Sequence, residues 1–315
     1  MSRPEANIPE IAILLAVYRG ALHLQAQLDS FVAQTHAAWH LTVSDDSPED
    51  DGSAEILDAF ARDYPERIID RRIGPKQGFA QNFLSLLATV PPDVPLAALS
   101  DQDDVWFPDK LTRGAAALAA VPPEVPALYC ASTVVCDEGL TPLGPSGSFS
   151  RPATFRNALV QSIGGGNTMM LNRAALDLVV SAAQEAGEIV AHDWWLYQVI
   201  TGCGGRVLRD PDPVLFYRQH EHNVIGANLS SKAQVERLRQ LLKGRFKNWN
   251  RINMVALARS EHRFSAQAGQ VLAAYRVSMQ GSMWRRLRAL RASGVYRQSR
   301  VGTLALYIAC MLGRL

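Results

Sequence analysis

Residues 96–106, LAALSDQDDVW, join a short apolar run to a cluster of acidic side chains. The run from Leu96 to Leu99 is typical of a buried strand, and Asp101, Asp103 and Asp104 follow it at once. Three acids so close together repel one another, and this costs stability unless something offsets their charge. The stretch therefore predicts a strand that ends in a specialised acidic loop.

The chain before this stretch alternates between strand-like and helix-like patterns. Strands are expected at 11–17, 41–44, 68–72 and 96–99, and helices at 22–34, 53–64 and 79–88. This alternation predicts an α/β fold with right-handed crossovers and a mostly parallel sheet. Ligands bind at the carboxyl ends of the strands in such sheets. The residues expected along that edge are Tyr18, Asp45, Asp46 and Asp101.

The chain after this stretch is less regular and then changes character. The expected elements are strands at 128–135, 168–171 and 214–217, helices at 173–184 and 193–201, and a Pro/Gly/Ser-rich loop at 139–152. Residues 229–315 contain 17 Lys and Arg but two acids, a net charge of +15, whereas the first 228 residues carry −13. We therefore predict an α/β domain over 1–228 and a helical, strongly basic region over 229–315.

The composition is that of an ordinary folded protein, with 48% hydrophobic and 20% charged residues. The polar N-terminus, with Pro4 and Pro9, does not resemble a signal peptide. The longest apolar run, 301–312, is too short to cross a bilayer as a helix, which needs about 20 residues. The four cysteines form no CxxC pair, which favours buried, reduced thiols. Together these features predict a cytoplasmic protein.

The acidic loop has two interpretations. Mg²⁺ or Mn²⁺ can bind carboxylate and phosphate oxygens together, and Asp101 and Asp103 alternate in a way that suits such a site. The alternative is a solvated acidic turn, which is common for an isolated DxDD. The strand before the loop and Trp106-Phe107-Pro108 after it favour the cation site.

Several spaced segments of the chain resemble glycosyltransferase family 2, and in particular its rhamnosyltransferase-type members. These segments are AVYRG (16–20), QLDSFVAQT (27–35), VSDDS (43–47), GFAQNFLSLL (78–87) and LSDQDDVWFPDKL (99–111). The resemblance covers about residues 10–228. It implies a GT-A fold, in which a Rossmann-like nucleotide-binding half (about 10–108) joins an acceptor-binding half (about 109–228). It also implies inverting, metal-dependent transfer of a sugar from a nucleotide diphosphate.

The resemblance also implies a set of nucleotide-sugar-binding residues. Ala16, Val17 and Tyr18 match the loop that packs against the base, and Asp45 and Asp46 match the acidic pair that bonds it. The remaining members of the set are Lys76, Gly78, Asn82, Asp101, Gln102 and Arg218. Residues 47–52 (SPEDDG) depart from the usual spacing after the acidic pair. The metal ligands implied are Asp101, Asp103 and His220, binding Mn²⁺ or Mg²⁺.

Inverting transfer needs a carboxylate that takes the proton of the acceptor hydroxyl. Asp193, in the segment AHDWW, resembles the family's base, and its apolar neighbours are expected to raise its pKa. A structural alternative is that Asp193 caps the following helix. The residues expected to bind the acceptor are Asp104, Trp106, Gly165, Asn167 and Trp194.

The basic C-terminal region has three interpretations: attachment to anionic lipid near a lipid-diphosphate-linked glycan, packing of basic helices against the acidic domain, and nucleic-acid binding. The first is preferred, which predicts a peripheral protein on the inner face of the cell membrane. The third lacks a recognised motif. Contact with other glycan-assembly enzymes through the apolar C-terminus stays open.

The predicted function is transfer of a sugar, with rhamnose from dTDP-rhamnose preferred over UDP-hexoses, to a glycan of a bacterial surface polysaccharide such as O-antigen. The alternative is a catalytically silent scaffold that binds sugar nucleotides. The presence of Asp101, Asp103 and Asp193 argues against that alternative. A nicotinamide-dependent dehydrogenase is disfavoured because no GxGxxG follows the first strand.

Overall fold

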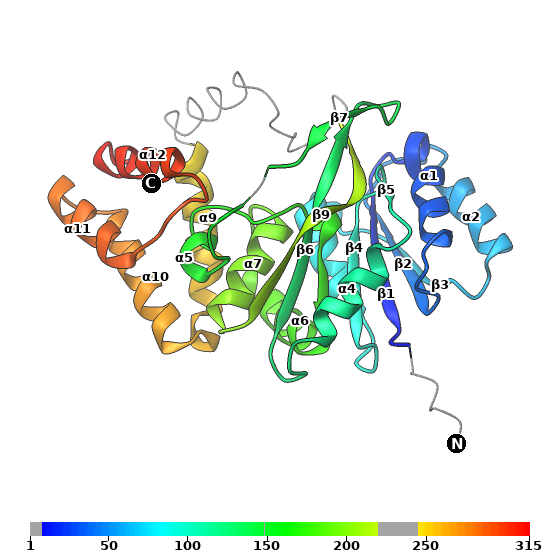
Figure 1. Ribbon diagram of the computed structural model, residues 1–315, viewed down its shortest axis with the longest axis horizontal. Coiled ribbons are helices and arrows are strands. Elements are labelled where there is room, and N and C mark those ends of the chain that lie inside the picture. Colours follow the sequence, from blue (N-terminus) through cyan, green and yellow to red (C-terminus); the bar gives the residue numbers. More distant parts are fainter. Residues whose placement is uncertain (1–7, 148, 220–244) are drawn as a thin grey trace.

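A mixed sheet crosses the molecule and has the strand order β3-β2-β1-β4-β8-β6-β9-β5, with β7 on β6 (Figure 1). This computed structural model describes residues 8–147, 149–219 and 245–315. The first half of the sheet is parallel and follows the predicted alternation. Its strands are β1 (Ile11–Val17), β2 (Trp39–Asp45), β3 (Ile68–Ile73) and β4 (Leu96–Ser100), and its helices are α1 (Ala21–Val32), α2 (Ser53–Asp63) and α3 (Phe79–Leu87).

The second half of the sheet is mixed. β8 (Met170–Asn172) runs antiparallel between β4 and β6 (Ala127–Cys136). β9 (Arg206–Arg218) runs parallel to β6 and antiparallel to β5 (Val105–Trp106). The hairpin strand β7 (Pro142–Pro145) extends β6.

Three of these strands differ from the predictions. β7 lies within the stretch 139–152, which was predicted to be a loop. β9 has 13 residues, whereas the sequence pattern indicates only its last part, because the first part carries charges and two prolines and is half-exposed. β5 has two residues and was not predicted, since two residues carry no periodicity.

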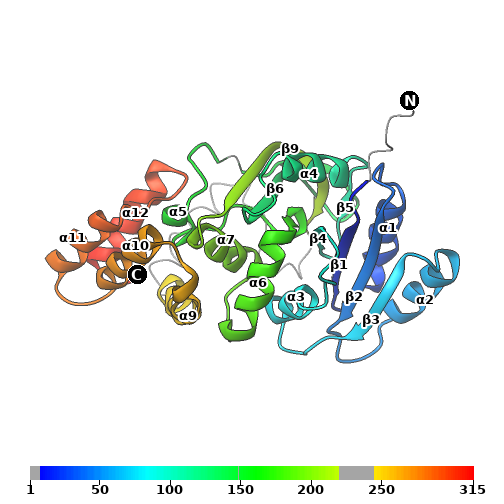
Figure 2. The same ribbon diagram turned by 90° about the horizontal axis from the view of Figure 1, so that it is seen from below.

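Helices cover both faces of the sheet, as Figure 2 shows from below. Successive β1 side chains alternate between two cores, as the pleat of a strand requires. Ile11, Ile13 and Leu15 pack with α1, α2 and α4 (Lys110–Ala119), whereas Ala12 and Leu14 pack with α3, α6 (Arg173–Ala186) and α7 (His192–Gly202). Burial on both faces explains why β1 is an uninterrupted apolar run.

The C-terminal region is helical, as predicted, and it packs against the α/β domain. It contains α9 (Arg245–Arg259), the 3₁₀ turn η2 (Glu261–Arg263), α10 (Ala266–Ser278), α11 (Met283–Ser293) and α12 (Arg300–Met311). The predicted boundary at residue 228 lies outside the described residues. In the described part, no helix has both the length and the apolar character that crossing a bilayer requires.

Polar contacts join the C-terminal region to the domain at several places. Arg263 of η2 forms an ion pair with Glu185 of α6 at 2.8 Å. Gln298 donates a hydrogen bond to Asn157 of the short helix α5 (Phe155–Ala158) at 3.0 Å. The packing of basic helices on the acidic domain therefore accounts for part of the positive charge.

Candidate active site

The loops after β1, β2 and β4 meet at one edge of the sheet, where the sequence predicted the ligand site. The backbone N–H of Asp46 donates to the carbonyl of Val17 at 2.8 Å and joins the first two loops. Tyr18, at the end of β1, is 52% exposed. Ala16 and Val17 are the last residues of β1, and Val17 is fully buried. Tyr18 is therefore the member of this group that can present a surface to a ligand.

Gln102 fastens the acidic loop to the β1 loop. Its Oε1 accepts a hydrogen bond from the backbone N–H of Tyr18 at 2.5 Å, and its Nε2 donates to the Tyr18 carbonyl at 2.7 Å. A Cβ on Gly20 would lie 2.9 Å from the Gln102 side chain, so glycine leaves room for this amide. Gln102 was predicted to bind the sugar nucleotide, but its amide is engaged in positioning Tyr18.

The two acids after β2 have different environments. Asp46 is buried, and its carboxylate accepts hydrogen bonds from the backbone N–H groups of Lys76 and Gly78, the latter at 3.3 Å. These bonds hold the 74–78 loop, in which Lys76 has a φ of +56°, a left-handed conformation. Asp45 is half-buried, and one of its oxygens accepts from Ser47 N–H at 2.9 Å. Asp45 is therefore the better candidate for contact with a nucleotide base.

Asn82, which was predicted to bind the sugar nucleotide, is fully buried. Its Oδ1 accepts from the Ser44 hydroxyl at 2.5 Å, and its Nδ2 donates to the Ser44 carbonyl at 3.1 Å. Asn82 thus joins α3 to the end of β2 and is a positioning residue, not a ligand contact.

The acidic loop contains two half-buried carboxylates and one that is fully buried. Burial raises the pKa of Asp101 to about 7, with repulsion from Asp103 and Asp193 adding to it and Lys110 opposing it. Asp104 is 0% exposed, and Asn167 Nδ2 donates to its Oδ2 at 2.5 Å. Burial, followed by repulsion from Asp103 and Asp101, raises the pKa of Asp104 well above its usual range. Asp104 and Asn167 were predicted to bind the acceptor. In the structure both are buried and are hydrogen-bonded to each other.

Lys110 is a fully buried amine beneath the acidic loop that the sequence pattern did not indicate as a site residue. Its Nζ donates to the Asn167 carbonyl at 2.8 Å and lies 2.9 Å from the centre of the Trp106 ring. Burial lowers its pKa well below the usual value, although Asp104 and Asp101 act in the opposite direction. The motif DDVWFPDK already placed a lysine six residues after Asp104, but only the tertiary structure turns α4 so that this lysine lies beneath the acids.

Asp193 lies in the first turn of α7, and it interacts electrostatically with Asp101 across the site. Its carboxylate accepts from the Trp194 N–H at 2.7 Å and from the Ser162 hydroxyl at 3.3 Å. Burial raises its pKa to about 6, while these two hydrogen bonds act in the opposite direction. Ala191 is the N-cap residue of α7, and Asp193 follows in the first turn, where its bond to the Trp194 N–H also stabilises the start of the helix.

The glycine-rich turn before β8 packs on a neutral histidine. Gly166 begins the 3₁₀ turn η1 (Gly166–Thr168), and a Cβ there would collide with Nε2 of His192. His192 is buried and stacks on Phe83 with a centroid distance of 3.8 Å, and burial lowers its pKa to about 3. Gly165 is exposed beside this turn. The turn therefore sets the position of the residue next to Asp193.

Three further predicted contacts have structural roles in the described chain. Trp106 is 2% exposed, and Trp194 is buried with its indole N–H bonded to the Ala158 carbonyl at 2.6 Å, so neither faces an acceptor. Arg218 is buried, its Nε donates to the Asp103 carbonyl at 3.0 Å, and its Nη1 donates to the Glu138 carbonyl. Arg218 thus positions the acidic loop, whereas the sequence predicted a phosphate contact. His220 lies outside the described residues.

The acidic loop fits a divalent cation. Asp101 and Asp103 are hard oxygen donors and are half-buried, and burial followed by repulsion from Asp103 raises the pKa of Asp101. No cluster of three or more His, Cys, Asp or Glu side chains suited to a metal occurs within 8–147, 149–219 and 245–315. The acidic loop would therefore supply two carboxylate ligands to the cation, and phosphate oxygens and water would have to supply the others.

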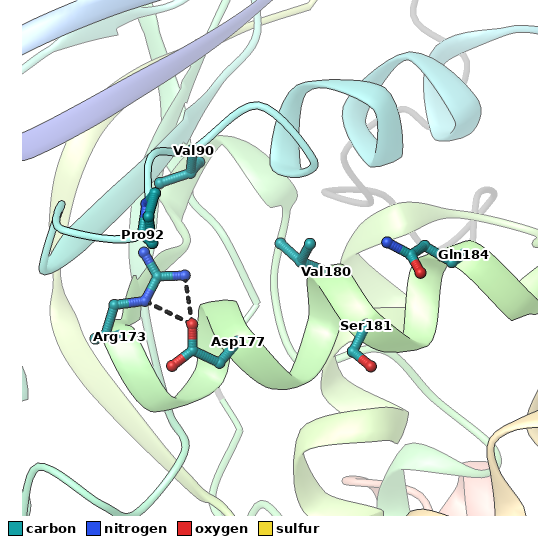
Figure 3. Close-up of a pocket in the computed structure, with 7 residues that line it drawn as sticks. All are labelled: Val90, Pro92, Arg173, Asp177, Val180, Ser181 and Gln184. Carbon is teal, nitrogen blue, oxygen red and sulfur yellow. Dashed lines mark hydrogen bonds and ion pairs between the residues drawn. The ribbon is translucent and has the colours of Figure 1, made fainter.

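A cavity of about 270 Å³ lies away from this edge, between α6 and the loop before β4 (Figure 3). Arg173 and Asp177 line it and are paired with each other at 2.8 Å. Arg173 also donates to the carbonyls of Pro91 and Val94. Because β4 begins at Leu96, the cavity lies at the amino end of that strand, opposite the acidic loop.

Comparisons with known proteins agree with this geometry. Residues 12–176, more than half of the chain, match the family described as "Glycosyl transferase family 2". The chain is 26% identical over 235 residues to "dTDP-rhamnosyl transferase RfbG" of Shigella flexneri, covering 71% of this chain and 78% of that protein.

Two solved structures show the same fold at low sequence identity. They are the mannosyltransferase PcManGT from Pyrobaculum calidifontis with GDP-Man and Mn²⁺ (TM-score 0.50, 16% identity, 98% of this chain and 86% of that one) and S. aureus TarS 1–349 with UDP-GlcNAc (TM-score 0.53, 13% identity, 97% and 89%). The fold is therefore of the GT-A type. With its family match and its acidic loop at the carboxyl edge, the chain is a glycosyltransferase and belongs to glycosyl transferase family 2.

Proposed function

We propose that this enzyme transfers rhamnose from dTDP-rhamnose to a glycan acceptor, with inversion at the anomeric carbon and with Asp193 as the base. The observation that carries this proposal is that the Asp193 carboxylate lies close enough to Asp101 for their repulsion to add to the raised pKa of Asp101. A base across the site from the diphosphate-binding edge is the arrangement that direct displacement of the leaving group needs. The donor assignment is supported by the similarity to the Shigella flexneri dTDP-rhamnosyl transferase.

The donor would lie along the carboxyl edge of the sheet. Tyr18 presents its exposed ring there, and the half-buried Asp45 can accept a hydrogen bond from the base. Asp101 and Asp103 are the residues that would hold Mn²⁺ or Mg²⁺. The bound cation would supply positive charge that stabilises the diphosphate as it leaves.

Asp193 is suited to remove the proton of the acceptor hydroxyl. Burial has raised its pKa to about 6, so the carboxylate is ionised near neutral pH and still a stronger base than an ordinary aspartate. Hydrogen bonds from Ser162 and the Trp194 N–H fix its orientation. The acceptor oxygen would attack the anomeric carbon while its proton passes to the carboxylate, and the bond to the diphosphate breaks on the opposite side.

The acceptor in this proposal is a lipid-diphosphate-linked glycan on the inner face of the cell membrane, used for a surface polysaccharide such as O-antigen. The support is the charge asymmetry of the chain, because an excess of arginine near a membrane favours anionic lipid. Contact with other glycan-assembly enzymes is compatible with this location.

Asp193→Asn tests the proposal, with turnover and donor binding measured separately. We expect turnover with dTDP-rhamnose to fall by about 10²-fold or more, while calorimetry shows donor binding within a factor of about two. Asp177→Asn on α6 is the matched control, since it removes a mostly exposed carboxylate and should leave both quantities unchanged. Unchanged turnover in Asp193→Asn would reject this base. A wild-type chain that binds donor but never turns over would favour the silent scaffold.

A further inference from the structure

We propose that the outer face of α12, together with the first turn of α11, is a docking surface for an anionic lipid bilayer. The α12 outer face is defined here as Val301, Leu304, Ile308, Met311 and Leu312. The inference rests on the proposed function only in the choice of a lipid-linked acceptor.

The helix α12 is apolar on both of its faces. Leu306, Ala309 and Cys310 are fully buried in the core, and the Cys310 thiol donates to the carbonyl of Ser278 in α10. Each residue of the α12 outer face lies three or four positions from another of its members, and together they form one stripe on the other side of the helix. Val301 is 78% exposed and Leu304 is 63% exposed. A helix at the surface of a soluble protein normally turns polar residues outward. An outer stripe of large aliphatic side chains therefore indicates a partner that is itself apolar.

The first turn of α11 extends this stripe. Arg286 donates hydrogen bonds to the carbonyls of Cys310 and Met311 at 3.0 and 2.8 Å, which holds the start of α11 against the end of α12. Two residues earlier in the same turn, Trp284 is 76% exposed, and Met283 beside it is also exposed. Indole rings favour the boundary between headgroups and hydrocarbon in a bilayer.

The charges around the stripe distinguish a lipid surface from other partners. No acidic residue occurs after Glu261, while Arg285, Arg288, Arg291 and Arg300 are all exposed. None of these four arginines forms an ion pair with a residue that the structure describes, whereas Arg263 and Arg276 are paired with Glu185 and Glu261. A second copy of the chain would bring the same arginines and be repelled. Anionic headgroups complement both the arginines and, through their acyl chains, the apolar stripe.

The position of α12 suits an enzyme whose acceptor is embedded in a membrane. In Figure 1 the chain enters β1 from the N-terminus at the bottom, so the parallel strands β1, β2 and β4 point their carboxyl ends to the top. α12 lies near the top of the same view. α12 and the edge that carries the acidic loop therefore lie toward the same end of the molecule in this view.

Vesicle co-sedimentation of the full chain, without donor or acceptor, tests the surface. Phosphatidylcholine vesicles are compared with vesicles that also contain phosphatidylglycerol. We expect binding to the anionic vesicles that weakens as salt is raised, and weak binding to the neutral ones. The double variant Leu304→Ser/Ile308→Ser should bind the anionic vesicles about tenfold more weakly or worse. The triple variant Arg285→Gln/Arg288→Gln/Arg291→Gln should lose most of the salt-dependent part of its binding to anionic vesicles.

Val255→Ser is the matched control, because Val255 on α9 is a half-exposed aliphatic residue of the same basic region. It should bind vesicles as the wild type does. Thermal unfolding of every variant checks that the fold is retained. Equal vesicle binding by wild type and the α12 double variant would overturn the inference. So would a dimer in light scattering that binds no vesicles and that Leu304→Ser/Ile308→Ser dissociates. If the donor were not dTDP-rhamnose, the enzyme would show no turnover with dTDP-rhamnose, whereas its binding to anionic vesicles would be the same.

Discussion

The side-chain amide of Gln102 bonds the backbone of Tyr18 twice, accepting from its N–H at 2.5 Å and donating to its carbonyl at 2.7 Å. This pair joins the acidic loop after β4 to the loop after β1, two segments that are 84 residues apart in sequence. The backbone that carries the exposed ring of Tyr18 is thereby fastened to the loop that carries Asp101.

Gln102→Ala should loosen this connection. Each lost hydrogen bond is expected to cost about 0.5–1.5 kcal/mol of folding free energy. Because the Tyr18 loop is then less well fixed, donor binding should weaken by roughly tenfold, with a smaller effect on turnover. Urea unfolding and calorimetric titration with the nucleotide diphosphate measure the two effects. Gln25→Ala, on the exposed face of α1, is a comparison in which donor affinity should not change.

The transfer rate should depend on pH through Asp193. Since its pKa is about 6 and the base must be ionised, kcat/KM is expected to fall about tenfold per pH unit below that value. The Ser162 hydroxyl stabilises the charged carboxylate, so Ser162→Ala should move this acidic limb to higher pH. Rate profiles of both proteins over the same pH range check the shift. An identical limb in the two proteins would assign it to another group.

Folding stability should fall as pH rises in the presence of a chelator. The pKa of Asp101 is raised from 3.8 to about 7, so its contribution is fully present below about pH 4 and is lost as the pH passes about 7. Asp101→Asn should lack this decline and melt about 2–4 °C above the wild type at pH 8. Mn²⁺ should raise the melting temperature of the wild type more than that of Asp101→Asn. Scanning calorimetry with and without the ion makes the comparison.

Gly166→Ala should be destabilising because its new Cβ meets the His192 ring. Overpacking at such a site costs about 1–3 kcal/mol. In the double variant Gly166→Ala/His192→Ala, the ring is absent, and the combined loss should be smaller than the sum of the single losses. Urea unfolding of all four proteins gives the coupling energy. Strict additivity would show that the two residues are not in contact in solution.

The sequence predicts the parallel half of the fold well, because each strand there is a short apolar run bounded by an amphipathic helix. The same reasoning places Tyr18, Asp45, Asp46 and Asp101 at one edge, and the structure brings them to that edge. These four residues lie at one edge because each ends or follows a strand of the same direction, and the order of strands and helices can be read from the sequence pattern.

What individual side chains do at that edge depends on tertiary contacts that leave no local pattern. Arg218 and Asn82 have the polar character of ligand contacts, yet the structure uses them to hold loops. Trp194 resembles an acceptor platform but lies in the core. Lys110 interacts with Asp104 and Asp101 because the fold places α4 beneath them, and no local pattern records this placement.

Pairing of β5 with β9 also fixes when the acidic loop can form during protein synthesis. Trp106 pairs with Leu215, about 110 residues later in the chain. Residues 101–104 therefore lack their holding strand, and Arg218, until β9 has left the ribosome. Strands β1 to β4 need only contacts within the first hundred residues and are free to assemble earlier. The nascent chain can thus build the parallel half of the sheet before it can order the carboxylates that would hold the cation.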